Sequence, residues 1–186
     1  MGIRESTETK LLNAADELFF THGITATPID AVLARAGVSA ATLYRGYASK
    51  EALVAAALER RQNAWLEVWD RAIDRQKTAR GKLLSVFDAL DEFHGRADEA
   101  RWCAFLGSAA EYASPPEEII RANAEETRTL RARLFHLAQP VDGHRASALA
   151  DQLVLVVTGD LAMHLRDPHH QASTARAIAT ALIGNR

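Results

Sequence analysis

Apolar side chains recur along this chain at intervals of three and four residues, the spacing of one face of a helix. In residues 5–22, for example, Leu11, Ala15, Leu18 and Phe19 share a face. No segment gives a convincing strand pattern, and there are no internal repeats. The sequence therefore predicts an all-α chain. The expected helices cover residues 5–22, 30–36, 40–47, 49–75, 82–94, 102–112, 117–137, 144–165 and 171–183.

Glycine and proline residues indicate where the expected helices end. Gly23 ends the first expected helix, and Pro140 with Gly143 predicts a break over residues 139–143. The helix before that break is expected to turn Ile120, Thr127 and Leu130 inward, together with Leu134 and Leu137. The helix at 102–112 is nearly all apolar or small, so we expect it to be largely buried.

Residues 30–50 predict two short helices that meet at a tight turn. Gly37 follows the last apolar position of the first helix, and glycine accepts the positive φ of such a turn. Ser39 has the short oxygen-bearing side chain of an N-cap, and Leu43 is placed to face inward. This arrangement is typical of a helix-turn-helix reader of DNA. A glycine-ended helix followed by a capped one in an ordinary bundle is the alternative.

Residues 9–53 as a whole resemble the N-terminal domain of the TetR/AcrR family of bacterial repressors. The matching pieces are LLNAADELFFTHG (11–23), Thr27, AGVSAATLY (36–44), Tyr47 and SKEAL (49–53). The resemblance implies a nine-helix TetR-like fold. Residues 1–48 would form a three-helix DNA-binding domain, and residues 49–186 a helical ligand-binding and dimerisation domain. Departures at Leu33, Ala41, Gly46 and Tyr47 affect the expected base preference rather than the motif.

The motif also gives an expected set of DNA contacts. The exposed side of the second helix should meet base edges in the major groove, and residues at adjacent helix starts should meet phosphates. Thr27 is the expected cap of the helix that follows Pro28, and the family resemblance places the matching threonine against a phosphate. The base-side residues are Ala40, Thr42, Tyr44 and Arg45; Ser39 is the cap; the phosphate-side residues are Thr27, Tyr47 and Lys50.

The charge pattern narrows the kind of DNA binding. The chain has a formal net charge of −2, and five basic and five acidic side chains cancel within residues 1–50. A non-specific binder depends on a broad basic surface. The sequence instead favours a dimer that binds a selected, palindromic operator.

Aromatic side chains in the body suggest a site for an apolar or aromatic ligand. Trp65 and Trp69 are four residues apart on the expected helix 49–75, which contains no glycine or proline and starts beside the motif. A ligand that shifts this helix would release the DNA. The candidate residues are Trp65, Trp69, Phe87, Trp102, Phe105 and Tyr112. A solid aromatic core is the alternative for each of them.

The C-terminal part of the chain predicts a homodimer. The run LVLVV at 153–157 and the alanine-rich last helix present more apolar surface than one body can cover. Residues 145–166 and 171–183 of two chains would form a four-helix interface. The alternative is that both helices are internal.

Other chemistry has little support in the sequence. Asp91 and His94 have the i, i+3 spacing of carboxylate-bridged metal bundles, but no second intact pair accompanies them, and His169 and His170 are expected in a surface loop. The single Cys103 is expected to be a small core residue, and no catalytic, metal or cofactor pattern is found. A polar N-terminus and short aliphatic runs predict a cytoplasmic protein. The family resemblance implies a bacterial one, bound to the nucleoid when on DNA. A helical metal or redox enzyme is the alternative function.

Overall fold

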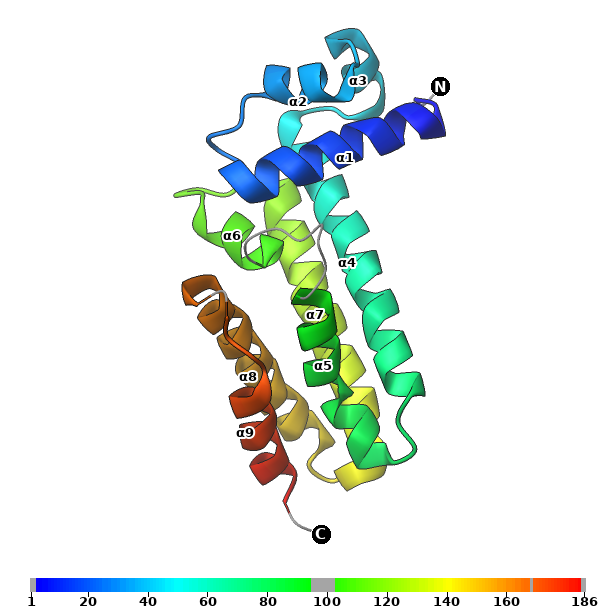
Figure 1. Ribbon diagram of the computed structural model, residues 1–186, viewed down its shortest axis with the longest axis vertical. Helices are drawn as coiled ribbons and strands as arrows, with labels where there is room; N and C mark the ends of the chain where they lie inside the picture. The colour runs from blue at the N-terminus through cyan, green and yellow to red at the C-terminus, as the bar shows by residue number, and fades with distance from the viewer. Residues whose placement is uncertain (1–2, 95–102, 168, 185–186) are drawn as a thin grey trace. The chain divides into compact units, whose positions relative to one another are not determined.

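The computed structural model describes residues 3–94, 103–167 and 169–184. Within these ranges the secondary structure is helical and without strands (Figure 1), which confirms the predicted all-α fold with nine helices. The helices are α1 (Glu5–His22), α2 (Ile29–Ala36), α3 (Ala40–Gly46), α4 (Lys50–Asp74), α5 (Ala79–His94), α6 (Ala104–Ala110), α7 (Glu117–Asp142), α8 (Ala146–Arg166) and α9 (Ser173–Ile183).

The predicted break at residues 139–143 is wrong for most of its length. Helix α7 continues through Pro140 and ends at Asp142. Proline has no N–H to donate to the carbonyl four residues earlier, and in a helix interior this disrupts the hydrogen-bond ladder. Pro140 lies in the last turn, however, and only Val141 and Asp142 follow it within the helix. Few hydrogen bonds therefore depend on this position.

The first compact unit is formed by the described residues of Met1–Arg61 and Ala100–Ala124. Its core joins α1, α2, α3 and the start of α4, and Ala104 of α6 and Ile119 of α7 complete it. Ile119 is buried whereas Ile120 is exposed, so the inward orientation predicted for Ile120 is wrong. A shift of one residue turns a side chain by about 100° around a helix.

Helix α6 is less buried than its composition predicts. Ala104 and Ser108 are buried, whereas Ala109 and Ala110 are exposed. Small side chains are compatible with burial but do not require it, so the prediction of a largely buried helix is wrong.

The second unit is formed by the described residues of Gln62–Glu99 and Glu125–Arg186. Its core combines α5, α8 and α9 with the later parts of α4 and α7, and Trp69, Phe87, Leu134 and Leu153 are among its buried side chains. Helices α4 and α7 thus contribute residues to both units. The predicted functional division at residue 48 remains a prediction.

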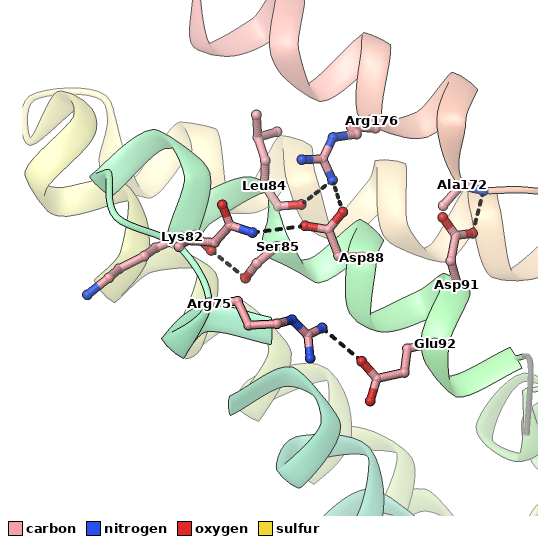
Figure 2. A network of polar contacts seen from close by, with 10 residues as sticks. Arg75, Lys82, Leu84, Ser85, Asp88, Asp91, Glu92, Ala172 and Arg176 are labelled. Carbon is pink, nitrogen blue, oxygen red and sulfur yellow. Dashed lines mark hydrogen bonds and ion pairs between the residues drawn. The ribbon is translucent and has the colours of Figure 1, made fainter. Parts of the chain in front are cut away.

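Polar contacts hold α9 against α5 (Figure 2). Arg176 donates to Asp88 Oδ1 at 2.5 Å and to the Leu84 carbonyl at 3.3 Å. The Ala172 backbone N–H at the start of α9 donates to Asp91 Oδ1 at 3.0 Å. These bonds fix which side of α9 faces its own unit.

A histidine–aspartate contact fixes the segment between α8 and α9. His170 Nε2 lies 2.7 Å from Oδ1 of Asp160, a buried residue of α8. The expected surface position therefore holds for His169, which is exposed, but not for His170, which turns inward. A buried carboxylate needs a polar partner, and His170 supplies it.

Helix α8 is long and apolar enough to cross a membrane by length and composition alone, and a core helix of a soluble protein can pass the same test. Here α8 packs on α9 and carries the buried Asp160. These contacts suit a helix that packs against protein on one side.

Candidate nucleic-acid interface

The turn between α2 and α3 has the predicted geometry. Gly37 adopts φ 64° and ψ 39°, the left-handed conformation that a side chain with a Cβ disfavours. The Val38 N–H donates to the Leu33 carbonyl at 3.1 Å, which satisfies a carbonyl at the end of α2. The turn therefore depends on glycine at position 37.

Helix α3 is capped and anchored as the sequence predicts. Ser39 is the N-cap, and its Oγ accepts from the Thr42 N–H at 3.3 Å and lies 2.9 Å from Thr42 Oγ1. Leu43 is fully buried in the core of the first unit. One side of this short helix is therefore fixed to the protein, and the other side is available to a partner.

The available side carries the residues expected to read bases. Ala40 and Arg45 are exposed, and Tyr44 is 53% exposed. Thr42 is half-buried because it packs toward Ser39. The surface thus offers a methyl group, a phenol and a guanidinium, which suit the apolar and hydrogen-bonding edges of base pairs.

Thr27 does not cap α2. Its hydroxyl donates to the carbonyls of Gly23 at 2.7 Å and Leu18 at 3.2 Å, and the residue is buried. The N-cap of α2 is Pro28, without a side-chain hydrogen bond. The predicted cap is therefore wrong, because the Thr27 hydroxyl closes the loop onto the end of α1.

Tyr47 ties the end of α3 to α1. It is buried, and its hydroxyl donates to Glu8 Oε1 at 3.0 Å. Burial raises the pKa of Tyr47, and the hydrogen bond to Glu8 raises it further. The tyrosine is therefore held in its neutral form at the base of the motif.

Lys50 is partly buried at the start of α4. Its Nζ donates to the Ile24 carbonyl at 2.5 Å and lies 5.6 Å from the centre of the Phe19 ring. Burial lowers the pKa of Lys50. Ser49 caps α4, as predicted, by accepting from the Ala52 N–H at 3.0 Å.

One contact in this unit has no local signal in the sequence. The Glu111 carboxylate, just after α6, accepts from the Thr25 N–H at 2.9 Å and from its hydroxyl at 3.2 Å. These residues are 86 positions apart, so neither helical periodicity nor the motif indicates the pairing. Glu111 fixes the loop that leads into α2.

The candidate ligand residues fall into two cores. Trp69 and Phe87 are buried in the second unit with Trp65 packed against them, whereas Phe105 and Tyr112 pack on the core of the first unit. Trp102 lies outside the described residues. The structure thus groups Trp65, Trp69 and Phe87 but does not group all six residues in one cluster.

The side chains of Asp91 and His94, the i, i+3 pair noted in the sequence, have separate roles. Asp91 accepts from the start of α9, and the His94 ring stacks on His164 with centres 3.9 Å apart. Cys103 is half-buried at the N-terminus of α6 rather than fully within a core. No group of three or more metal-binding side chains was found in the part of the chain that the structure describes.

Comparisons with known proteins agree with this geometry. Residues 11–57 match the family model for bacterial regulatory proteins of the tetR family. A TetR-family transcriptional regulator from Streptomyces coelicolor is 25% identical to this chain. The match covers 97% of this chain and 95% of the Streptomyces protein, with a TM-score of 0.85. A tetR-type regulator from Streptomyces avermitilis is 26% identical over 96% of this chain and 90% of its own, with a TM-score of 0.71.

The reduced form of NemR from E. coli is 19% identical over 96% of this chain and 95% of its own, with a TM-score of 0.78, and supports the fold alone. No curated protein matches. The family match covers the helix-turn-helix, and the structural likeness extends over nearly the whole chain. Residues 11–57 therefore match the tetR-family helix-turn-helix, and the likeness over nearly the whole chain supports a TetR-family, DNA-binding transcriptional regulator.

Proposed function

We propose that this regulator is a repressor that binds a palindromic operator as a homodimer and is released by a small apolar or aromatic ligand. It would act in the bacterial cytoplasm, on the nucleoid when bound to DNA. The observation that carries the DNA-binding part is the exposed side of α3, which presents Tyr44 and Arg45 while Leu43 anchors the helix.

Base reading is assigned to Ala40, Thr42, Tyr44 and Arg45. Arg45 is an exposed cation, and an arginine can donate two hydrogen bonds to one guanine in the major groove. Ala40 and Thr42 offer methyl groups that fit the methyl of thymine. Ser39 holds the first turn of α3 in position for these contacts.

Phosphate contact is assigned to Thr27, Tyr47 and Lys50. Lys50 has the strongest support, because an ammonium group has three donors and the Ile24 carbonyl takes one of them. The hydroxyls of Thr27 and Tyr47 already donate within the protein. A phosphate bond from either hydroxyl would require it to leave its present partner.

Dimerisation is assigned to residues 145–166 and 171–183. Leu155 is 74% exposed and Met163 is 45% exposed, and with Gly159 they lie at intervals of four along α8. Ile178 of α9 is 49% exposed. A second copy of the same surface would bury this apolar stripe and would bring two α3 helices to a palindromic site.

Ligand control is assigned to the aromatic residues of the body. The second unit contains Trp65, Trp69 and Phe87 together. Residues 62–74 of α4 belong to this unit, and the same helix begins at Lys50, near the motif. A ligand that displaces this helix would act on the DNA-binding residues. Phe105, Tyr112 and Trp102 complete the proposed set.

A gel-shift experiment tests the proposal directly. The full-length protein and a labelled fragment from upstream of its own gene should form a complex that resists unlabelled non-specific DNA. Metal analysis of the same preparation tests the enzyme alternative. A metal-containing protein that does not bind this fragment more tightly than random DNA would contradict the repressor proposal.

A further inference from the structure

Two polar atoms on α4 are buried in the second unit without a hydrogen-bond partner among the described residues. They are Nε1 of Trp69 and Oε1 of Gln62. The Trp69 side chain is fully buried. A buried polar group loses its hydrogen bonds to water, so proteins leave few such groups unpaired. Both atoms therefore call for a partner.

The two atoms lie along one face of α4. Gln62 is seven positions before Trp69, which is about two helical turns, or ~10.5 Å along the axis. Trp65 lies between them, with its ring centre 5.8 Å from that of Trp69 and 5.6 Å, edge to face, from that of Phe93. Trp65, Trp69 and Phe93 thus form an aromatic cluster. The unpaired donor, Trp69 Nε1, belongs to this cluster, and the unpaired acceptor, the Gln62 oxygen, lies about two turns before it on α4.

Helix α7 packs beside this face of α4. The Arg133 guanidinium lies 5.0 Å from the centre of the Trp69 ring and pairs with Asp70. In the second unit α4 and α7 run in the same direction (Figure 1). Glu126 is seven residues before Arg133, as Gln62 is seven before Trp69, so helical periodicity puts Glu126 on the same side of α7 as Arg133, about two turns earlier.

Glu126 adds a negative group at that end of the aromatic cluster. Burial raises the pKa of Glu126, because it penalises the charged carboxylate. The Thr127 hydroxyl donates to it at 3.3 Å, and no cationic side chain among the described residues pairs with it. A donor from outside the protein would stabilise both Glu126 and the Gln62 oxygen.

We propose that this part of the second unit binds an aromatic amine. Its ring would pack on the aromatic cluster, an oxygen at one end would accept from Trp69 Nε1, and the amine at the other end would donate to Gln62 and Glu126. A purely apolar compound would leave Trp69 Nε1 and the Gln62 oxygen without a hydrogen bond. This inference rests on the proposed ligand control, and it specifies the chemistry of the ligand.

Three matched probes test this chemistry by calorimetric titration of the full-length protein. Tyramine has a ring, a hydroxyl and an amine, whereas phenethylamine lacks the hydroxyl and 4-ethylphenol lacks the amine. We expect tyramine to bind at least tenfold more tightly than either. Trp69→Phe should abolish the preference over phenethylamine. Gln62→Leu should reduce the preference over 4-ethylphenol, with Glu126 left as the remaining acceptor for the amine. Gln139→Leu, at an exposed position of α7, is the matched control and should change neither preference.

A second measurement avoids dependence on a core variant. In the wild-type protein, the indole N–H signal of Trp69 should move downfield when tyramine is added, and Trp65→Phe and Trp102→Phe identify this signal by elimination. The absence of tyramine binding, or equal binding of all three probes, would overturn the inference while operator binding stays intact. Tyramine binding without DNA release would instead uphold this site and contradict the proposed ligand control.

Discussion

The carboxylate of Glu111 accepts two hydrogen bonds from Thr25, at 2.9 Å from the backbone N–H and 3.2 Å from the hydroxyl. Thr25 lies in the loop between α1 and α2. The Glu111 side chain, which follows α6, therefore fixes the loop that leads into the helix-turn-helix. The Lys50 Nζ bond to Ile24 fixes the neighbouring residue of the same loop. The orientation of α2 therefore depends on residues distant from it in sequence.

Removing this contact should weaken both the fold and the DNA complex. We expect Glu111→Ala to lower the free energy of unfolding by about 1–2 kcal/mol, because two hydrogen bonds to a charged group are lost. Operator affinity should fall several-fold. Urea unfolding and gel shifts measure the two effects. Glu117→Ala is the control, because its exposed pair with Arg121, at 3.8 Å, contributes little.

Replacing Arg45 tests the assignment of base contacts. We expect Arg45→Ala to weaken binding to the operator by about 1–3 kcal/mol and to relax the preference for it, because a base contact is lost. Thr42→Ala should act in the same direction. Competition gel shifts with operator and random DNA measure the change. Equal weakening on both DNAs would instead assign Arg45 to a phosphate.

Replacing Lys50 tests the phosphate contact. Lys50→Ala should weaken all DNA sequences alike and reduce the slope of log affinity against log salt by about one unit, because one phosphate contact is lost. Its bond to Ile24 is lost as well, so stability must be measured in parallel. An unchanged salt slope would show that Lys50 has a role only within the protein.

The sequence predicted the parts of the motif that follow from local chemistry. Gly37 adopts the left-handed turn, Ser39 caps α3, and Leu43 is buried, because backbone geometry and short-range hydrogen bonds determine all three. The phosphate-side residues were harder to place. Thr27, Tyr47 and Lys50 bond to Gly23, Glu8 and Ile24, and only the folded chain brings these groups together.

Periodicity also left the candidate ligand residues unresolved. It identified Trp65 and Trp69 as neighbours on one face of α4, which the 5.8 Å between their ring centres confirms. It could not separate them from Phe105 and Tyr112, which pack on the other core, because an apolar stripe does not specify its partner. The unpaired Trp69 Nε1 is likewise a property of the packed structure alone.

Tyr47 should make the protein less stable at alkaline pH. In the unfolded chain tyrosine ionises near pH ~10, whereas the raised pKa keeps folded Tyr47 protonated. The unfolded state then binds fewer protons, so the free energy of unfolding falls as pH rises above about 10. Tyr47→Phe should reduce this slope, as measured by urea unfolding over a pH series. Burial also raises the pKa of Tyr112, so some slope should remain until Tyr112→Phe is added.

A charge on the apolar stripe of α8 should prevent dimerisation. Leu155→Glu places a carboxylate where the proposed interface would exclude water, and a desolvated charge without a partner is strongly unfavourable. We expect a folded monomer by light scattering. Operator affinity should fall by at least about tenfold, because a monomer presents one α3 helix to the DNA where the dimer presents two linked ones. Ile120→Glu is the matched control, since Ile120, like Leu155, has an exposed aliphatic side chain but lies on α7. If the wild-type protein is a monomer at micromolar concentration, or if both variants remain dimers, the interface does not lie on α8 and α9.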